Sequence, residues 1–160
     1  MMTHSHDAKP MRISRLQLAQ LMQPEHANTH GNVHGGWIMK LVDEAGALAS
    51  TRHAAHRTVT VAIDRMIFSH PIHIGDLVFF NAEVTYAGRT SMEVEVKVTA
   101  ENPITGERVQ TNTAYLVYVA IDDHGKPTQI PPLLAETSDE KTRMEAAYKR
   151  QQSRLLQVTE

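Results

Sequence analysis

Hydrophobic and polar residues alternate along much of this chain, which is the pattern of half-buried β-strands. The clearest run is at residues 91–98, where hydrophobic and polar residues alternate one by one. The hydrophobic residues are Met92, Val94, Val96 and Val98, and the polar residues are Ser91, Glu93, Glu95 and Lys97. Similar alternation predicts strands over residues 13–22, 59–63, 78–86 and 111–121. Turn sequences at 87–89 and 102–106 join strand 91–98 to its neighbours on either side, so these three strands are predicted to form an antiparallel meander.

One segment lacks this alternation and is apolar throughout. Between Trp37 and Ala49 only four residues are not plainly apolar: Lys40, Asp43, Glu44 and Gly46. A helix that is apolar on nearly every side is surrounded by protein. Residues 35–52 are therefore predicted to form a buried helix, with Asn32 as its N-cap.

The C-terminal part has a helical pattern of a different kind. Residues 138–157 are predicted to form a surface helix that Ser138 caps, with a thin apolar stripe of Met144, Ala147, Tyr148 and Leu155. The chain is thus expected to consist of a flexible tail over residues 1–11, a main domain over residues 12–131 and a helical extension over residues 132–160.

The predicted order of elements is strand, buried helix, four strands and surface helix, which indicates an α+β fold. A single antiparallel sheet can cover one helix on one face only. The edge of the sheet and its far face then need a partner, so we expect the chain to form a homo-oligomer.

The composition excludes several classes of protein. The 160 residues fit one domain, and the absence of cysteine excludes disulfides, thiolate metal sites and cysteine nucleophiles. The net charge is -2 with no basic block, so we expect no nucleic-acid partner. No apolar stretch is long enough to span a membrane, and the first residues lack a signal-peptide core. We therefore expect a cytoplasmic protein without membrane attachment.

The chain contains ten histidines, and their spacing first suggests a metal site. His26, His30 and His34 recur every four residues, which on a helix would form a metal-binding stripe. Asn28 and Gly31 make a helix there unfavourable, so we expect no metal site and expect most histidines on the surface. His34 is the exception, because it precedes the buried helix directly and could lie at the mouth of a substrate site.

Asp43 is an acidic residue in the middle of the most apolar helix. One interpretation is structural: Asp43 forms an ion pair with Lys40 or caps a neighbouring loop. The other is that it is a catalytic carboxylate, whose basicity burial and neighbours adjust. Glu44 is expected to face away from Asp43, since adjacent residues of a helix do not share a face.

Gly35 and Gly36 lie in the first turn of the same helix. Their N–H groups have no acceptor within the helix and could stabilise an oxyanion, or the two glycines could merely permit tight packing. Gly36 and Asp43 are seven residues apart, roughly 10 Å along the helix axis. A base and an oxyanion donor act on the same group, so one copy of the helix cannot easily supply both. We therefore predict a site shared between two subunits.

These residues belong to one extended pattern. It runs through Asn28, Gly31, His34-Gly35-Gly36, Asp43-Glu44 and Gly46, then the strand Thr58–Ala62 and the turn Gly88-Arg89-Thr90-Ser91. This joint pattern, over about residues 12–131, resembles that of the hotdog-fold acyl-CoA thioesterases, a family whose closest branch here includes the YciA-type bacterial enzymes and the brain-type acyl-CoA hydrolase.

The resemblance implies a hotdog fold, in which an antiparallel sheet wraps a long central helix, and hydrolysis of acyl-CoA to a fatty acid and coenzyme A. It implies that Asn28 and Asp43 are catalytic and face each other across a dimer. It further implies a hexamer, built as a trimer of dimers. Coenzyme A enters only as part of the substrate, and no cofactor is expected.

The resemblance also implies contacts with the substrate. Thr60 and Val61 would lie along the pantetheine arm, and Gly88, Arg89, Thr90 and Ser91 near the nucleotide. Arg89 is then either a clamp on phosphate or a solvated turn residue. His34, Gly35 and Gly36 are the expected substrate-binding residues at the start of the helix.

Two other functions fit the same pattern. A hotdog hydratase or dehydratase would use a catalytic histidine, and His34 is the candidate, although the Asn28–Asp43 spacing favours hydrolysis. A non-catalytic acyl-CoA sensor would use the same pocket without turnover.

Overall fold

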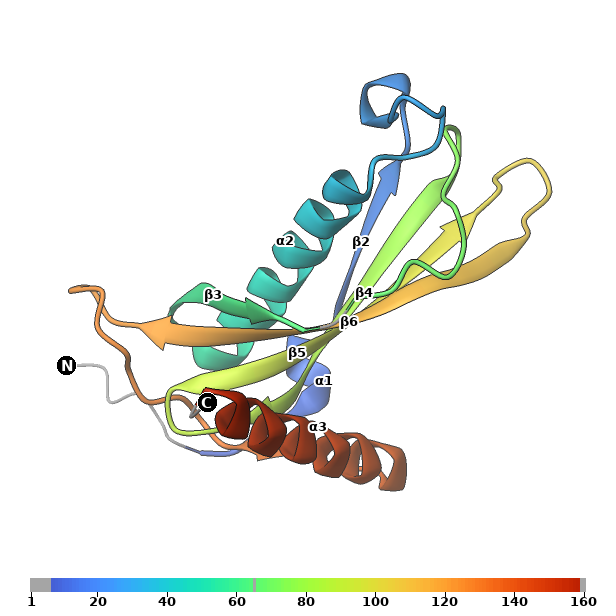
Figure 1. The fold of residues 1–160 in the computed structure, drawn as a ribbon. Coiled ribbons are helices and arrows are strands. Elements are labelled where there is room, and N and C mark those ends of the chain that lie inside the picture. The colour runs from blue at the N-terminus through green and yellow to red at the C-terminus, as the bar shows by residue number, and fades with distance from the viewer. Residues whose placement is uncertain (1–6, 65, 159–160) are drawn as a thin grey trace.

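A five-stranded antiparallel sheet curves around one long helix in the computed structural model, which describes residues 7–64 and 66–158 (Figure 1). The strand order is β2-β4-β5-β6-β3. The strands are β2 (Leu16–Leu21), β3 (Arg57–Ile63), β4 (Leu77–Ala87), β5 (Ser91–Glu101) and β6 (Arg108–Ile121). The predicted meander of β4, β5 and β6 and the α+β fold class are both confirmed.

The central helix α2 (Gly35–Ala54) lies in the curve of the sheet and forms the core with it (Figure 1). The alternate residues of β5 that face α2 are fully buried: Met92, Val94, Val96 and Val98. The helix meets them with Val42, Ala45 and Ala49, which are also fully buried. Each large apolar side chain buried in this way contributes about 1.5–3 kcal/mol, so the contact between helix and sheet dominates the stability of the fold.

The N-terminal prediction is wrong in part. Of the residues 13–22 predicted to form a strand, only those of β2 do so. A short helix, α1 (Met11–Ser14), precedes this strand. The Ser14 hydroxyl donates to the carbonyl of Met11 at 2.8 Å and accepts the N–H of Val84 at 2.9 Å, which fixes this turn of helix on the sheet. Alternation alone does not reveal such a contact.

Regular structure also begins earlier than the expected tail boundary. β1 (Lys9–Pro10) pairs in parallel with β7 (Leu133–Leu134), and Met11 is fully buried. The tail expected over residues 1–11 therefore does not extend to Lys9. Residues 1–6 lie outside the described part of the chain.

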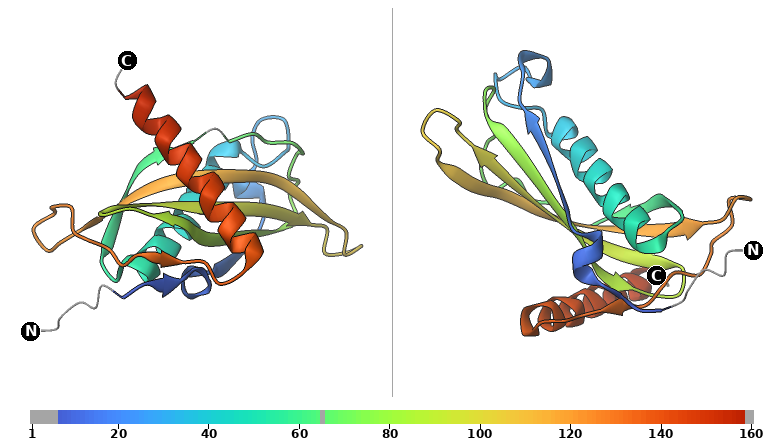
Figure 2. Two further views of the ribbon diagram at one scale, coloured as in Figure 1. Left: turned by 90° about the horizontal axis from the view of Figure 1, so that it is seen from below. Right: turned by 180° about the vertical axis from the view of Figure 1, so that it is seen from behind.

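The C-terminal helix α3 (Ser138–Gln157) covers the sheet on the side opposite to α2, so the molecule has three layers (Figure 2). Its N-cap is Thr137, not the expected Ser138. The Thr137 hydroxyl accepts the N–H of Glu140, and the Glu140 carboxylate accepts the N–H of Thr137 in return. This capping box places the N-cap one residue before the predicted one, while the helix itself spans the predicted residues 138–157.

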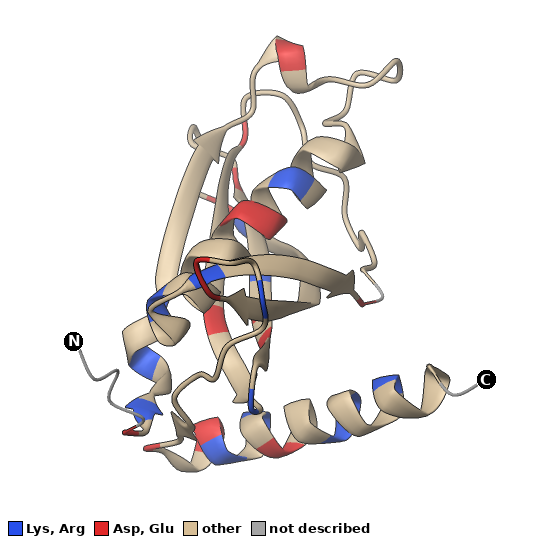
Figure 3. Cartoon of the chain, turned by 90° about the vertical axis from the view of Figure 1, so that its left-hand side faces the viewer, with Lys and Arg blue, Asp and Glu red and all other residues tan. Residues whose placement is uncertain are grey.

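The far face of the sheet, for which a partner copy was expected, is covered instead by α3 of the same chain, and the polar side chains of β5 at Glu93 and Glu95 are buried beneath that helix. Glu93 is 1% exposed and Glu95 is 7% exposed. Arg150 donates to the Glu93 carboxylate at 2.8 and 3.0 Å, and Arg154 bridges Glu93 and Asp64. Figure 3 shows the basic positions spaced along α3, next to acidic positions of the sheet. Ion pairs, rather than apolar contacts, therefore attach most of this helix.

Most histidines were expected on the surface, but two of them, His26 and His53, are buried. His53 is fully buried near the end of α2, with Nε2 2.7 Å from the carbonyl oxygen of Pro131. Burial lowers the pKa of His53 because the charged form is desolvated there. His26, in the short 3-10 helix Pro24–His26, packs edge-on against Trp37 with ring centroids 4.8 Å apart.

Across the described residues, no helix is both long and apolar enough to cross a membrane.

The substitution Glu93→Gln tests the attachment of α3. It leaves Arg150 without a charged acceptor in a buried place and Arg154 with Asp64 as its only carboxylate partner, so we expect the free energy of unfolding, measured by urea denaturation, to fall by roughly 3 kcal/mol. Glu101→Gln is the matched control, because Glu101 pairs with the exposed side chain of Arg108, and such pairs are worth about 1 kcal/mol or less. Equal losses in the two variants would contradict this assignment.

Candidate functional site

The loop before α2 folds around the side chain of Asn28. Its Oδ1 accepts the N–H groups of His30 at 2.9 Å and Asn32 at 3.2 Å, and Gly31 adopts a positive φ of 83° within the turn. The main chain occupies Oδ1, which leaves the amide nitrogen Nδ2 as the remaining polar group of this side chain. It forms no hydrogen bond with the described residues, so Asn28 is held as a ready donor.

A cavity of about 200 Å³ opens beside this loop at the N-terminal end of α2. Its lining includes Asn28, Gly35, Ile38, Phe68 and Ile72. The ring of Phe68 lies 3.6 Å from the position that a Cβ on Gly35 would take. The cavity thus joins one amide donor, one glycine backbone and an apolar wall, which suits a polar group attached to an apolar chain.

The start of α2 differs from the expected one in its cap. His34, not Asn32, is the N-cap, and its Nδ1 accepts the N–H of Gly36 at 2.9 Å. Asn32 lies two residues before the cap, in the loop, where it forms an isolated β-bridge with His73. The Gly36 N–H is therefore occupied, whereas that of Gly35 has no partner among the described residues. Of the two predicted oxyanion donors, only Gly35 is available.

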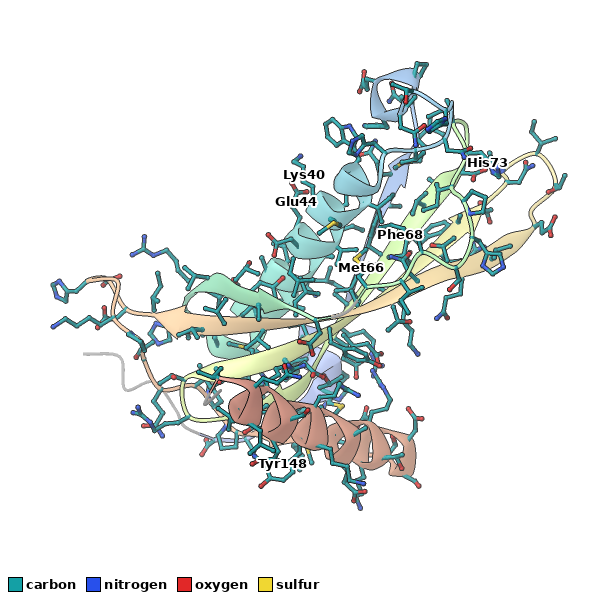
Figure 4. The ribbon with its side chains drawn as sticks, viewed as in Figure 1. Lys40, Glu44, Met66, Phe68, His73 and Tyr148 are labelled. Atoms are coloured by element: carbon teal, nitrogen blue, oxygen red, sulfur yellow. The ribbon has the colours of Figure 1, made fainter. Side chains whose placement is uncertain are left out.

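Asp43 does not form the ion pair with Lys40 that its structural interpretation required. Its Oδ1 accepts the hydroxyl of Thr60 at 2.7 Å and that of Tyr118 at 3.0 Å. Lys40 instead pairs with Glu44 at 3.3 Å. The side chains of Lys40 and Glu44 project from the flank of α2 away from Phe68 (Figure 4). The Asp43 carboxylate has no cationic partner among the described residues, and its Oδ2 accepts no hydrogen bond from them.

Tyr118 is a residue that the sequence pattern missed. It lies on β6 and is fully buried, with its hydroxyl against α2. Burial, and then the neighbouring Asp43 carboxylate, raise the pKa of Tyr118 well above its usual value. The hydroxyl therefore stays protonated and donates to Asp43. β6 carries hydrophobic residues on both faces, so alternation did not identify the face that meets α2. The sequence feature that could have indicated this contact is Gly46, a glycine within an apolar helix that leaves room for the Tyr118 hydroxyl.

One copy of the chain does not bring the predicted site residues together. Asn28 and Gly35 line the cavity, whereas Asp43 does not. Asp43 follows Gly35 by eight residues, roughly 12 Å along the helix axis. Thr60 contacts Asp43, and Val61 follows it on the edge strand β3 with its side chain 55% exposed.

The turn Gly88-Arg89-Thr90-Ser91 joins β4 and β5 at the other end of the sheet (Figure 1). The Gly88 N–H donates to the Ser91 carbonyl at 2.8 Å, and the carbonyls of Arg89 and Thr90 accept the N–H groups of Ile130 and Ala120. The Arg89 side chain is exposed. The turn is thus rigid and presents an arginine, but far from the Asn28 cavity of the same copy.

The described residues contain no group of three or more histidine, aspartate or glutamate side chains placed to hold a metal ion. His26 packs on Trp37 and His34 caps α2, so the four-residue spacing of these histidines does not form a stripe.

Comparison with known proteins identifies the family. The profile of the thioesterase superfamily matches residues 30–107. VdlD of Helicobacter pylori is 38% identical over 141 residues, which are 88% of this chain and 80% of that protein. The chain belongs to the thioesterase superfamily. The human cytosolic acyl coenzyme A thioester hydrolase is 36% identical over 140 residues, which are 82% of this chain and 37% of the human protein.

Solved structures agree with this family and with the predicted hotdog fold. A hexameric acyl-CoA thioesterase in its apo form is 36% identical, with a TM-score of 0.91 over 95% of this chain and 97% of that one. A Staphylococcus aureus acyl-CoA hydrolase, in complex with butyryl coenzyme A and coenzyme A, is 30% identical, with a TM-score of 0.85 over 95% and 94%. Related structures of that enzyme carry alanine in place of an asparagine, an aspartate and a threonine, numbered 28, 43 and 60 there.

The capping role of His34 gives a direct prediction. His34→Ala removes the acceptor for the Gly36 N–H, so we expect the free energy of unfolding to fall by about 1 kcal/mol. His34→Asn restores an acceptor at the cap and should recover most of this loss. Any acyl-CoA turnover should persist in His34→Asn. Loss of acyl-CoA turnover in His34→Asn would instead indicate that His34 is a catalytic histidine, as in a hydratase.

Proposed function

We propose that this chain hydrolyses acyl-CoA thioesters to a carboxylic acid and coenzyme A, at a site formed by two copies of the chain. The observation that carries the proposal is the Asp43 carboxylate, which lies in the middle of α2 with one oxygen bound by two hydroxyls and the other free. A carboxylate without a cationic partner, held by neutral donors, is suited to act as a base or a nucleophile.

Membership of the family supports the reaction and the residues. The S. aureus relative was solved with butyryl coenzyme A, which is an acyl thioester of this class. The residues replaced by alanine in its variant structures have the same types and numbers as Asn28, Asp43 and Thr60 of this chain. These agreements support the roles proposed for the three residues.

In the proposed reaction, Asp43 removes a proton from water, whose oxygen attacks the thioester carbonyl carbon, or attacks that carbon directly. The carbon–sulfur bond then breaks and coenzyme A leaves as its thiolate. On the direct route this leaves an anhydride between the acyl group and Asp43, which water then hydrolyses to release the carboxylic acid and regenerate the carboxylate. Asn28 Nδ2 and the Gly35 N–H donate to the carbonyl oxygen, on which negative charge develops. One such donor contributes roughly 3 kcal/mol to the transition state. Water and these groups suffice for the reaction, so we propose that it needs no added cofactor.

The need for a second copy follows from the edge of the sheet. β3 pairs only with β6, and its outer residues Val59, Val61 and Ile63 are each at least 40% exposed. Met39 and Leu48 on α2 are exposed beside it. An open edge with apolar side chains favours association of two copies. Such a dimer would bring Asp43 of one copy near the Asn28 cavity of the other, and the hexameric relative supports a larger assembly of dimers.

Two further parts of the proposal concern substrate and location. The turn at Gly88–Ser91 is proposed to bind the nucleotide of coenzyme A, with Arg89 on a phosphate and Thr90 near it. Thr60 and Val61 would border the pantetheine arm. The name of the human relative supports a cytosolic location.

Release of free thiol from acyl-CoAs, ranging from acetyl-CoA to palmitoyl-CoA, tests the proposed reaction. We expect turnover by the wild-type chain and a loss of roughly 10³-fold in kcat for Asp43→Asn, because that change removes the basic group. Glu44→Gln is the matched control: it neutralises the adjacent carboxylate, which faces away and pairs with Lys40, and should leave kcat unchanged.

Absence of thiol release from folded wild-type protein across the series would overturn the proposal. Binding of acyl-CoA without turnover would then support a sensor. Equal losses in Asp43→Asn and Glu44→Gln would also contradict the assigned role of Asp43.

A further inference from the structure

A buried tyrosine approaches the candidate carboxylate from inside the protein. The Tyr118 hydroxyl lies 3.0 Å from Asp43 Oδ1 and also 3.0 Å from the Asp43 carbonyl oxygen. Tyr118 is fully buried between the sheet and α2. A buried hydroxyl needs a partner, and here the partner is a residue proposed to carry out the reaction.

The register of the sheet explains why two hydroxyls meet at the same oxygen. Thr60 on β3 and Tyr118 on β6 are direct cross-strand partners, and a register shift follows immediately after Thr60. Both side chains reach Asp43 Oδ1, at 2.7 and 3.0 Å. With Oδ1 accepting both bonds, the carboxylate is fixed in rotation and Oδ2 is left for chemistry.

Gly46 makes this approach of the tyrosine feasible. A Cβ on Gly46 would lie 2.3 Å from the Tyr118 hydroxyl oxygen and 3.0 Å from the ring carbon that bears it. Gly46 follows Asp43 by three residues, on the same side of α2. A glycine inside a helix costs about 1 kcal/mol relative to alanine. This cost is offset if the gap serves to admit the hydroxyl.

The carboxylate is the stronger of the two acceptors for this hydroxyl. The Asp43 carbonyl lies inside α2, where it accepts the usual helix hydrogen bond, whereas a hydrogen bond to an ionised carboxylate is roughly twice as strong as a neutral one. The hydroxyl therefore holds the carboxylate rather than only the helix backbone.

We propose that Tyr118, admitted by Gly46, is a positioning residue for the hydrolysis: together with Thr60 it fixes the Asp43 carboxylate so that Oδ2 faces the reacting group. The inference rests on the proposed function, because it assigns Tyr118 a task within that same site. It acts through Asp43 and does not require Tyr118 to touch the substrate.

Tyr118→Phe is the direct test, because phenylalanine keeps the buried ring and removes only the hydroxyl. We expect kcat for thiol release to fall roughly 10-fold, with KM within about twofold of wild type. Tyr115→Phe is the matched control. Tyr115 lies three residues earlier on β6 with its ring against Arg150 under α3, so its hydroxyl should not affect kcat.

Gly46→Ala provides a second, independent measurement. The added methyl group should displace the Tyr118 hydroxyl and lower kcat about as much as Tyr118→Phe does. In the Tyr118→Phe background the nearest clashing atom is absent, so the same change should have a smaller effect on kcat, a non-additivity that a double-mutant cycle measures. Full additivity would contradict coupling through the hydroxyl.

The outcomes separate this inference from the proposed function. Thiol release by the wild type with equal kcat in Tyr118→Phe overturns the positioning role and leaves the reaction standing. Equal losses in Tyr118→Phe and Tyr115→Phe also overturn it, since the effect would then be general. Absence of turnover by the wild type overturns the proposed function itself.

Discussion

The packing of α2 into the curve of the antiparallel sheet is the contact on which the rest of the structure depends. It buries the inner faces of β4, β5 and β6 against small residues of the helix, among them Ala45 and Ala49. It also fixes where the helix presents its polar groups. The Gly35 N–H lies at one end beside the Asn28 loop, and Asp43 lies two turns later, against β3 and β6. The length of helix between Gly35 and Asp43 therefore keeps these two groups apart within one copy, and a second copy is needed to bring such groups together.

Different interactions hold the two helices on the two faces of the sheet. α2 is attached by apolar contact, whereas α3 is attached largely through arginines that reach buried carboxylates such as Glu93. Buried ion pairs add little net stability compared with an apolar contact, but an unpaired member is costly. Such pairs therefore favour one position of the helix over others. Through Arg154 and Asp64, α3 is also joined to the end of β3, just before the segment that carries Phe68.

Much of the fold could be predicted from the sequence because its strongest signals are periodic. The alternation at Met92–Val98 and the apolar run at Trp37–Ala49 gave the meander and the central helix. Prediction failed where a polar residue has a tertiary partner. Glu93 looks like a solvent-facing residue of a strand, and only the arginines of α3, more than fifty residues away, make its burial tolerable. The prediction of the helix caps failed for a related reason. The geometry of the preceding loop determines which residue caps each helix, and here these residues are His34 and Thr137.

The candidate site was predictable in its residue types and only partly in its contacts. Asn28, Gly35 and Asp43 occupy environments that suit their predicted roles, whereas the Gly36 N–H is used by the cap. The hydroxyl bonds to Asp43 could not be predicted, because they depend on the pairing of Thr60 with Tyr118 across two strands that are distant in the sequence. The separation of Asn28 from Asp43 within one copy agrees with the shared site inferred from helix length.

Mixing of two inactive variants tests the shared site most directly. Asn28→Ala and Asp43→Asn are combined in equal amounts under conditions that exchange subunits, and thiol release from an acyl-CoA is measured. If each site takes one residue from each copy, every mixed dimer contains one intact site, and activity recovers to about one quarter of wild type. If both residues act within one copy, no intact site can form, and a mixture that remains inactive after verified exchange would contradict the account.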